Sequence, residues 1–259
     1  MSRARTKAVV TWVLRVALLF QCVGMFRHAH VDGTAIGEAL FELLRWSETS
    51  MLIVERGLAW AALLAAVACL VVTSRLLLGF LAGYFLLDAC LGWVVGGTFA
   101  PALVLPSDAA RYLLPLALSW WARDRDDDDR LATWLMRVGI GVTFVGHGTE
   151  ALLHNPHFVD YIIAAGQRVL SMRIEQAAAE TILTAIGIVD VGVGAATLAG
   201  RRWRGVFGYM AAWGLLTSLA RIVYLGPGKW PAVAIRAAHV GLPVALFLTC
   251  ARTPDPSSD

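Results

Sequence analysis

The sequence predicts an all-α, polytopic membrane protein with about eight transmembrane helices, arranged as two tandem, parallel four-helix repeats. Three observations lead to this class. The 259-residue chain is 58% hydrophobic and only 16% charged, whereas soluble domains carry about a quarter charged residues. Its mean hydropathy is +0.65, and its apolar residues gather in long segments. Finally, two pairs of segments match each other at nearly the same spacing along the chain.

A membrane helix needs about 20 mainly apolar residues. The segments that meet or approach this length are 8–26, 51–73, 76–98, 108–122, 131–149, 179–199, 204–225 and 232–251. The first of them follows the basic stretch SRARTK and could be mistaken for a signal peptide. We expect a retained helix, because Trp12, Arg15 and Gln21 interrupt the apolar run and no small-residue cleavage site follows.

The basic residues of the connecting segments predict that both termini are cytoplasmic. With the N-terminus inside, the inner segments hold Arg3, Arg5, Lys7, Arg75, Arg123, Arg125, Arg130, Arg201, Arg202, Arg204 and Arg252. The outer segments hold only Arg27, Arg45, Arg168, Arg173 and Lys229. Nearly all basic residues are arginine, which indicates the base composition of a bacterial genome. We therefore expect an integral protein of the bacterial inner (plasma) membrane.

The chain divides into four parts on this basis. Residues 1–122 form an N-terminal four-helix unit, 123–130 (RDRDDDDR) a charged cytoplasmic linker, 131–251 a C-terminal four-helix unit, and 252–259 a disordered tail. Two outer loops, 33–47 and 158–170, place apolar residues at helical spacing. Each is expected to form an amphipathic helix that either lies on the outer interface or caps the bundle.

An internal repeat supports the division. The segment WVLRVALLFQCVG (12–24) aligns with WLMRVGIGVTFVG (134–146), and AARYLLPLAL (109–118) aligns with AAHVGLPVAL (237–246). The order of segments is preserved in the two halves. Because each half has an even number of spans, the repeats are expected to be parallel, related by an axis along the membrane normal.

The second half also resembles a known family. The run RVGIGVTFVGHGTEAL, from Arg137, is followed by HFVDYI, and IVDVGVGAATLAGRR places Asp190 before a Gly-rich stretch. Over 131–225 this pattern resembles the DoxX-like family of four-helix integral membrane proteins. The resemblance implies a four-helix unit and a link to quinone-coupled membrane redox systems. In the first half, Met25 and Phe26 stand where the His-Gly pair would be.

Ionisable groups inside a span usually pair or line a cavity. Arg137 and Asp190 have compatible depths, so the sequence predicts an Arg137–Asp190 ion pair. Such a pair could be a step in a proton or substrate path, or could fix how two helices dock. By similar depth, Arg15 is expected to pair with Asp88.

A second polar group is predicted at the outer face, where His147, Glu150, Arg221, Tyr224 and His239 have similar depths. Imidazole and guanidinium groups in a half-buried pocket suit a quinone or an anionic head group. The alternative is that the histidine and glutamate meet interfacial water and that the arginine extends to the interface.

Other cofactors find little support. His147, Glu150 and His154 share a helix face and are the weak candidates for a metal site, but Pro156 ends that helix. His147 and His239 are the candidate axial ligands for haem, and neither haem nor metal is expected. The cysteines form no CxxC motif, and no basic stripe indicates nucleic acid.

Three functions remain open from the sequence, and no catalytic residue is assigned. The first is a membrane redox component that binds quinone in the outer pocket and receives electrons from a partner protein. The second is a transporter of a small molecule or ion. The third is a non-catalytic membrane scaffold or assembly factor. All three place the protein in the lipid bilayer.

Overall fold

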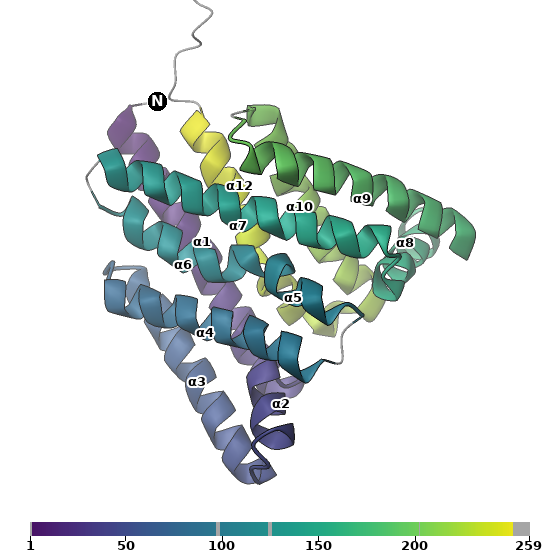
Figure 1. Ribbon diagram of the computed structural model, residues 1–259, viewed down its shortest axis with the longest axis horizontal. Helices are drawn as coiled ribbons and strands as arrows, with labels where there is room; N and C mark the ends of the chain where they lie inside the picture. Colours follow the sequence, from purple (N-terminus) through teal and green to yellow (C-terminus); the bar gives the residue numbers. More distant parts are fainter. Residues whose placement is uncertain (1, 97–98, 124–125, 202, 251–259) are drawn as a thin grey trace, which may run out of the picture.

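The computed structural model describes residues 2–96, 99–123, 126–201 and 203–250, and this part of the chain is helical without strands (Figure 1). Its elements are α1 (Arg3–Val31), α2 (Ala35–Glu42), α3 (Glu48–Cys69), α4 (Arg75–Val95), α5 (Pro101–Ser107), α6 (Ala109–Trp121), α7 (Asp126–Leu152), α8 (Pro156–Val169), α9 (Gln176–Leu198), α10 (Arg204–Leu225), the 3₁₀ turn η1 (Pro227–Lys229), α11 (Trp230–Ala234) and α12 (Ala237–Cys250). The all-α prediction is confirmed.

Seven of the predicted spans each coincide with one helix, and the eighth, 232–251, covers the end of α11, a turn and α12. The described residues do not provide eight helices that could cross a membrane independently. Five are long and apolar enough: α1 with α2, α3, α4, α9 and α10. A sixth is obtained if η1, α11 and α12 are taken as one span bent by 49°. With 13 residues, α6 is too short, and α7 is long but polar at both ends.

The short helix α6 lies inside the bundle. It packs against α1, α4, α7 and α12, and Leu114, Leu118 and Trp121 are fully buried there. The outer helices differ, because they expose large apolar side chains, among them Ile53, Leu64, Leu76, Trp93, Ile188 and Leu216. Such extended apolar surface is costly in water and suits a bilayer.

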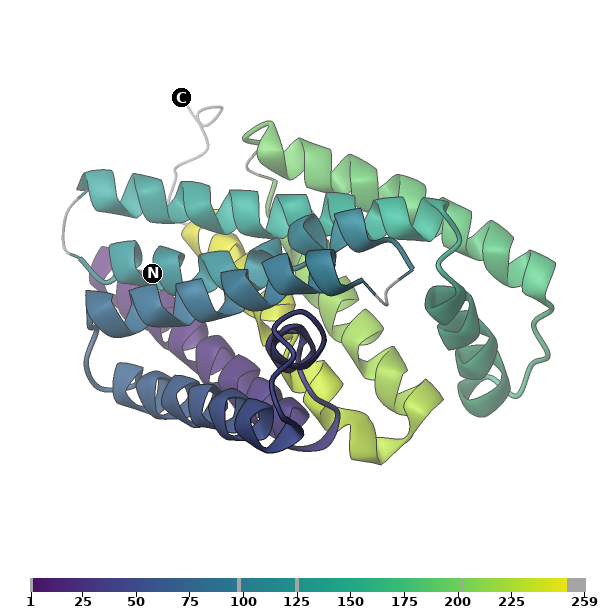
Figure 2. The same cartoon turned by 60° about the horizontal axis from the view of Figure 1, so that its bottom comes forward.

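The long helices α1 and α7 each pack against several other helices. α1 lies on α3 and α12, and α7 lies on α9 and α6 (Figure 2).

The tightest helix pair, α7 and α9, is packed through glycine. A Cβ atom placed on Gly148 would meet the carbonyl oxygen of Gly187 at 3.0 Å, and one placed on Gly194 would meet that of Gly141 at 2.7 Å. Small residues allow backbones in membrane helices to approach this closely. The Gly-rich run of the sequence therefore serves helix packing.

The predicted linker is mostly helical. Asp126–Asp129 form the first turn of α7, where their charge is favourable at the helix N-terminus. Arg3 donates a hydrogen bond to Asp126, and Lys7 Nζ donates one to Asp129 at 3.1 Å, so α1 and α7 are tied at this end. The predicted tail, 252–259, lies outside the described residues.

Candidate functional site

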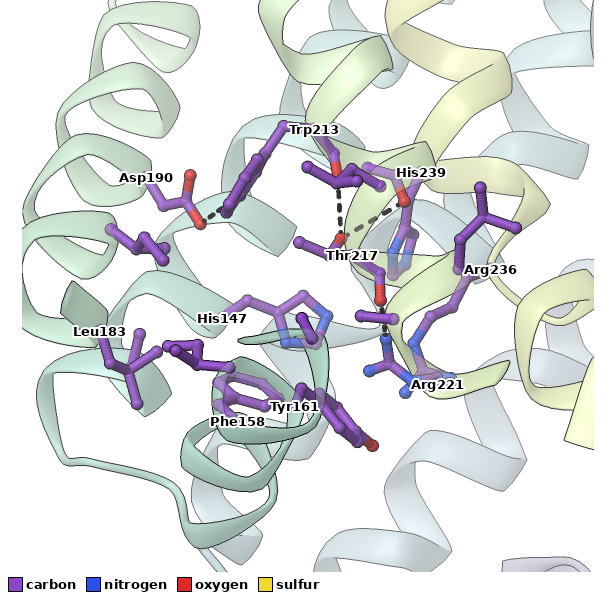
Figure 3. Close-up of a pocket in the computed structure, with 18 of the residues that line it drawn as sticks. His147, Phe158, Tyr161, Leu183, Asp190, Trp213, Thr217, Arg221, Arg236 and His239 are labelled. Atoms are coloured by element: carbon purple, nitrogen blue, oxygen red, sulfur yellow. Dashed lines mark hydrogen bonds between the residues drawn. The ribbon is translucent and has the colours of Figure 1, made fainter. Parts of the chain in front are cut away.

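A cavity of about 490 Å³ lies between α7, α8, α9, α10 and the start of α12 (Figure 3). Its wall is mainly apolar. The ionisable and hydrogen-bonding side chains that reach it are Thr143, His147, Tyr161, Asp190, Trp213, Thr217, Arg221, Arg236 and His239. A cavity of this size, with an apolar wall and few polar groups, is typical of small-molecule binding sites.

A smaller cavity of about 300 Å³ adjoins the first and shares His147, Phe158, Tyr161, Arg221 and Arg236 with it. Its remaining lining is more polar and includes Ser107, Asp108 and Arg111 from α5 and α6, and Glu150 from α7. The first cavity has a mainly apolar wall and the smaller one a more polar wall, to which both halves of the chain contribute.

The helix α8 closes one side of the cavity. α7 ends at Leu152, and His154 adopts a positive φ of 54°, so the break before Pro156 occurs where the sequence predicts it. The side chain of Asn155 then caps α8 by accepting a hydrogen bond from the backbone N–H of His157. The predicted apolar face of this helix, Phe158, Tyr161, Ile162 and Ala165, lines the cavity, so α8 caps the bundle.

Three of the predicted outer-pocket residues, His147, Arg221 and His239, lie around the cavity (Figure 3). The rings of His147 and His239 are 5.5 Å apart. Nδ1 of His147 is 3.6 Å from Glu150 Oε1, and neither that nitrogen nor Nε2 of His239 has a hydrogen-bond partner among the described residues. Glu150 faces the smaller cavity and accepts hydrogen bonds from Ser107 (2.6 Å) and Asn155 (3.2 Å).

Two guanidinium groups reach the cavity from the side opposite Asp190 (Figure 3). Arg221 is 6% exposed, donates to the carbonyl oxygen of Thr217 and lies over the ring of Tyr161, 5.3 Å from its centroid. Arg236, between α11 and α12, donates to the carbonyl oxygen of Ala232. Within the described chain, neither forms an ion pair with a carboxylate.

The predicted Arg137–Asp190 pair is wrong. Asp190 is buried and accepts hydrogen bonds from Tyr209 Oη (3.2 Å) and Trp213 Nε1 (3.1 Å), both on α10. Arg137 instead donates to the carbonyl oxygen of Gly200, beyond the C-terminus of α9. Ten residues of helix span roughly 15 Å, so Arg137 lies far from Asp190 along the axis. Arg137 therefore hydrogen-bonds the turn that follows α9 and does not reach the middle of that helix.

The predicted Arg15–Asp88 pair is wrong for the same reason. Arg15 donates to the carbonyl oxygen of Leu70 (2.9 Å) and to Thr73 Oγ1 (2.8 Å) at the end of α3. Asp88 instead lies 3.4 Å from Arg111, which also pairs with Asp108 at 2.6 Å.

Two other candidates lie elsewhere. Tyr224 does not line the cavity: its hydroxyl donates to Asp160 (3.0 Å) and its ring contacts that of Tyr161. His154 turns to Thr184 on α9, 2.8 Å away. No group of three or more potential metal ligands occurs in the described part of the chain, so His147, Glu150 and His154 do not converge.

The sequence reasoning missed Arg236, which lines both cavities. A signal was present, because Arg236 falls inside the predicted span 232–251 and a basic residue within a span is a functional candidate. Tyr161 was predicted on the apolar face of its helix, but its contact with Arg221 could not be foreseen from spacing.

Several helices of this fold could cross a membrane, which is consistent with an integral membrane protein that holds an internal pocket. The sequence matches no protein-family model and no curated protein, and the fold matches no solved structure.

The hydrogen bonds of Asp190 give a first prediction. Asp190→Asn should lower the free energy of unfolding by about 1–3 kcal/mol, because an amide cannot accept from both Tyr209 and Trp213 without burying its own unsatisfied NH₂ group. Thermal unfolding in detergent measures this. Glu180→Gln, at a half-buried position of the same helix, should leave the midpoint unchanged, because an amide oxygen can still accept the hydrogen bond from Gln176. Equal midpoints for the two variants would contradict the assignment.

Proposed function

We propose that this chain is an integral protein of the bacterial inner membrane with both termini in the cytoplasm. The exposed apolar side chains of α3, α4, α9 and α10 and the excess of basic residues in the predicted inner segments support this topology. In it, α6 belongs to the membrane-embedded core although it is too short to span, because neighbouring helices surround it.

We also propose that the two halves arose by duplication, and contacts at matched positions support this. Arg15 and Arg137, which align, each donate to a carbonyl oxygen at the end of the third helix of their own half. Gly24 and Gly146 also align. A Cβ on Gly24 would meet the backbone nitrogen of Ile235 at 2.5 Å, and one on Gly146 would meet that of Ser107 at 2.8 Å. Ser107 and Ile235 precede the two aligned buried helices.

For the function itself, we propose that the protein binds an amphipathic small molecule in the cavity between α7, α8, α9, α10 and α12, as a carrier or transporter would. The observation that supports this best is the composition of the wall. An apolar space of about 490 Å³ is bordered by His147, Arg221, Arg236 and His239, and a more polar cavity adjoins it. A molecule with an apolar body and a polar head matches both parts.

Filling the cavity tests this proposal. The protein is purified in mild detergent, and the lipids and other small molecules that accompany it are identified by mass spectrometry. We expect a defined species with the wild type and its loss in Ala165→Trp, whose indole would occupy the space beside α8. Ala177→Trp, on exposed α9 surface away from the cavity, should retain it. A wild type free of any such species, or equal amounts in both variants, would overturn the proposal.

A quinone-linked redox component is the second candidate, and the two histidines favour it. His147 Nδ1 and His239 Nε2 have no hydrogen-bond partner within the described chain, so each imidazole nitrogen is available to hydrogen-bond a quinone oxygen. The resemblance of 131–225 to the DoxX-like family supports the same role, in which a redox partner protein would supply electrons. In the experiment above, quinone would then be the retained species, and His147→Ala and His239→Ala would release it.

A further inference from the structure

The charge of the cavity identifies its ligand more closely, if the proposed binding function holds. We infer that the cavity binds an amphiphile with an anionic head, carboxylate or phosphate, and that Arg221 and Arg236 receive this head.

The first step is the state of the two arginines. A guanidinium carries five N–H donors, and the hydrogen bonds of each group go to a carbonyl oxygen of its own chain segment: Arg221 to Thr217 and Arg236 to Ala232. Both side chains line both cavities, and Figure 3 shows them beside each other. Neighbouring cations away from water are costly unless an anion accompanies them.

The second step concerns the carboxylates nearby, because each is already engaged. Asp108 pairs with Arg111 at 2.6 Å, and Glu150 accepts hydrogen bonds from Ser107 and Asn155. Asp190 lines the larger cavity but is held by Tyr209 and Trp213. Two positive groups are therefore left facing the cavity without an acidic partner among the described residues.

The third step is the apolar space that surrounds the two guanidinium groups. The cavity of about 490 Å³ extends from Arg221 past Phe158, Ile162 and Leu183. A separate apolar cavity of about 600 Å³, between α1, α10 and α12, also reaches Arg236. Its wall includes Trp12, Val16 and Phe20, which are exposed on the outer surface of α1. An alkyl chain thus has room beside the charged groups, whereas a free inorganic anion would leave this space empty.

A neutral quinone fits these observations less well. Its carbonyl oxygens can accept hydrogen bonds but bring no charge to offset that of Arg221 and Arg236. A carboxylate or phosphate brings both hydrogen-bond acceptors and negative charge. Its bidentate, charge-assisted hydrogen bonds to arginine are stronger than those of a neutral acceptor.

The test compares probes that share one alkyl chain. Dodecanoate, dodecyl phosphate, dodecanol and a decyl-substituted benzoquinone are titrated into the purified full-length protein at about pH 8, where the fatty acid is ionised. Binding is followed by calorimetry. We expect the better of the two anions to bind at least about tenfold more tightly than dodecanol and the quinone. Whichever of dodecanoate and dodecyl phosphate binds more tightly tells whether the natural head group is a carboxylate or a phosphate.

Variants then assign the preference to the two arginines. Arg221→Gln and Arg236→Gln should each reduce the preference for the anion over dodecanol, and the double variant should abolish it while dodecanol binding persists. Arg204→Gln, at the exposed start of α10, is the control and should behave as the wild type. Because the comparison of probes uses the wild type, the inference is tested even if a variant fails to fold.

The outcomes separate the inference from the function on which it rests. Equal affinity for dodecanoate, dodecyl phosphate and dodecanol, or tightest binding of the quinone, would overturn the anionic ligand and leave the binding function standing. Binding of none of the four probes would count against the binding function. An anion preference that survives in the double variant would remove the two arginines from the site.

Discussion

Arg111→Met should destabilise the protein by about 3–5 kcal/mol, the cost of removing one partner of a buried ion pair. Arg111 is buried in α6 and holds two carboxylates, Asp108 at 2.6 Å and Asp88 at 3.4 Å. Methionine has a similar length but no charge, so the substitution would leave both acids close together without a cation. Unfolding in mixed detergent micelles measures the loss, and reduced folded yield is its coarser sign.

A second substitution separates the loss of charge from a change of packing. In the double variant Arg111→Met, Asp88→Asn, one of the two acids becomes neutral, and about 1–3 kcal/mol of the lost stability should return through coupling between the sites. Arg75→Met, at the exposed start of α4, should change stability little. A double variant no more stable than Arg111→Met would show that the guanidinium matters for its packing rather than for its charge.

The position of Arg111 illustrates why the pairings were harder to predict than the helices. Length and composition suffice to locate an apolar helix, and all predicted spans except 232–251 coincide with one. The position of a residue within its span, however, gives only its depth along the membrane normal. It does not say to which side of the helix the side chain turns, nor which neighbour lies there. Asp88 therefore has Arg111 as its partner and not Arg15, although both basic residues were visible in the sequence.

The candidate pocket was more predictable for a related reason. The sequence placed His147, Arg221 and His239 at similar depths, and it predicted an amphipathic helix where α8 lies, whose apolar face lines the cavity. The pocket residue that was not predicted lies where a helix is interrupted. Arg236 lies in the turn between α11 and α12, inside the mainly apolar segment 232–251 that was predicted to be a single continuous helix.

Eight spans were predicted, whereas five or six segments of the described residues are long and apolar enough to cross a membrane, because hydropathy does not distinguish lipid from protein as surroundings. An apolar segment such as α6 is buried among α1, α4, α7 and α12, and its side chains satisfy the same pattern as those of a spanning helix. In a soluble protein, a surface helix has one polar face and a fully buried helix has none. In a membrane protein, a spanning helix and a buried helix can both be apolar on all faces, so this distinction is lost. Only the length, 13 residues, marks α6 as an internal helix.

Gly194→Val is the other substitution with a large expected effect, because it would separate the two helices that carry His147 and Asp190. The first added atom, Cβ, would lie 2.7 Å from the carbonyl oxygen of Gly141 and 2.9 Å from a methyl group of Val145. The carbonyl belongs to the backbone of α7, so rotation of a side chain cannot relieve the contact. Overpacking of this kind costs about 1–3 kcal/mol where side chains can shift and more where backbone must move.

The matched control lies two residues away on the same helix. Gly192 has nothing within 4 Å of an added Cβ, so Gly192→Val carries the same change in composition and helix propensity without the contact. We expect Gly194→Val to give little or no folded protein in detergent, and Gly192→Val to resemble the wild type. If both variants unfold at the same midpoint, α7 and α9 do not pack through these glycines. The cavity between them would then lack the rigid wall on which binding of any ligand depends.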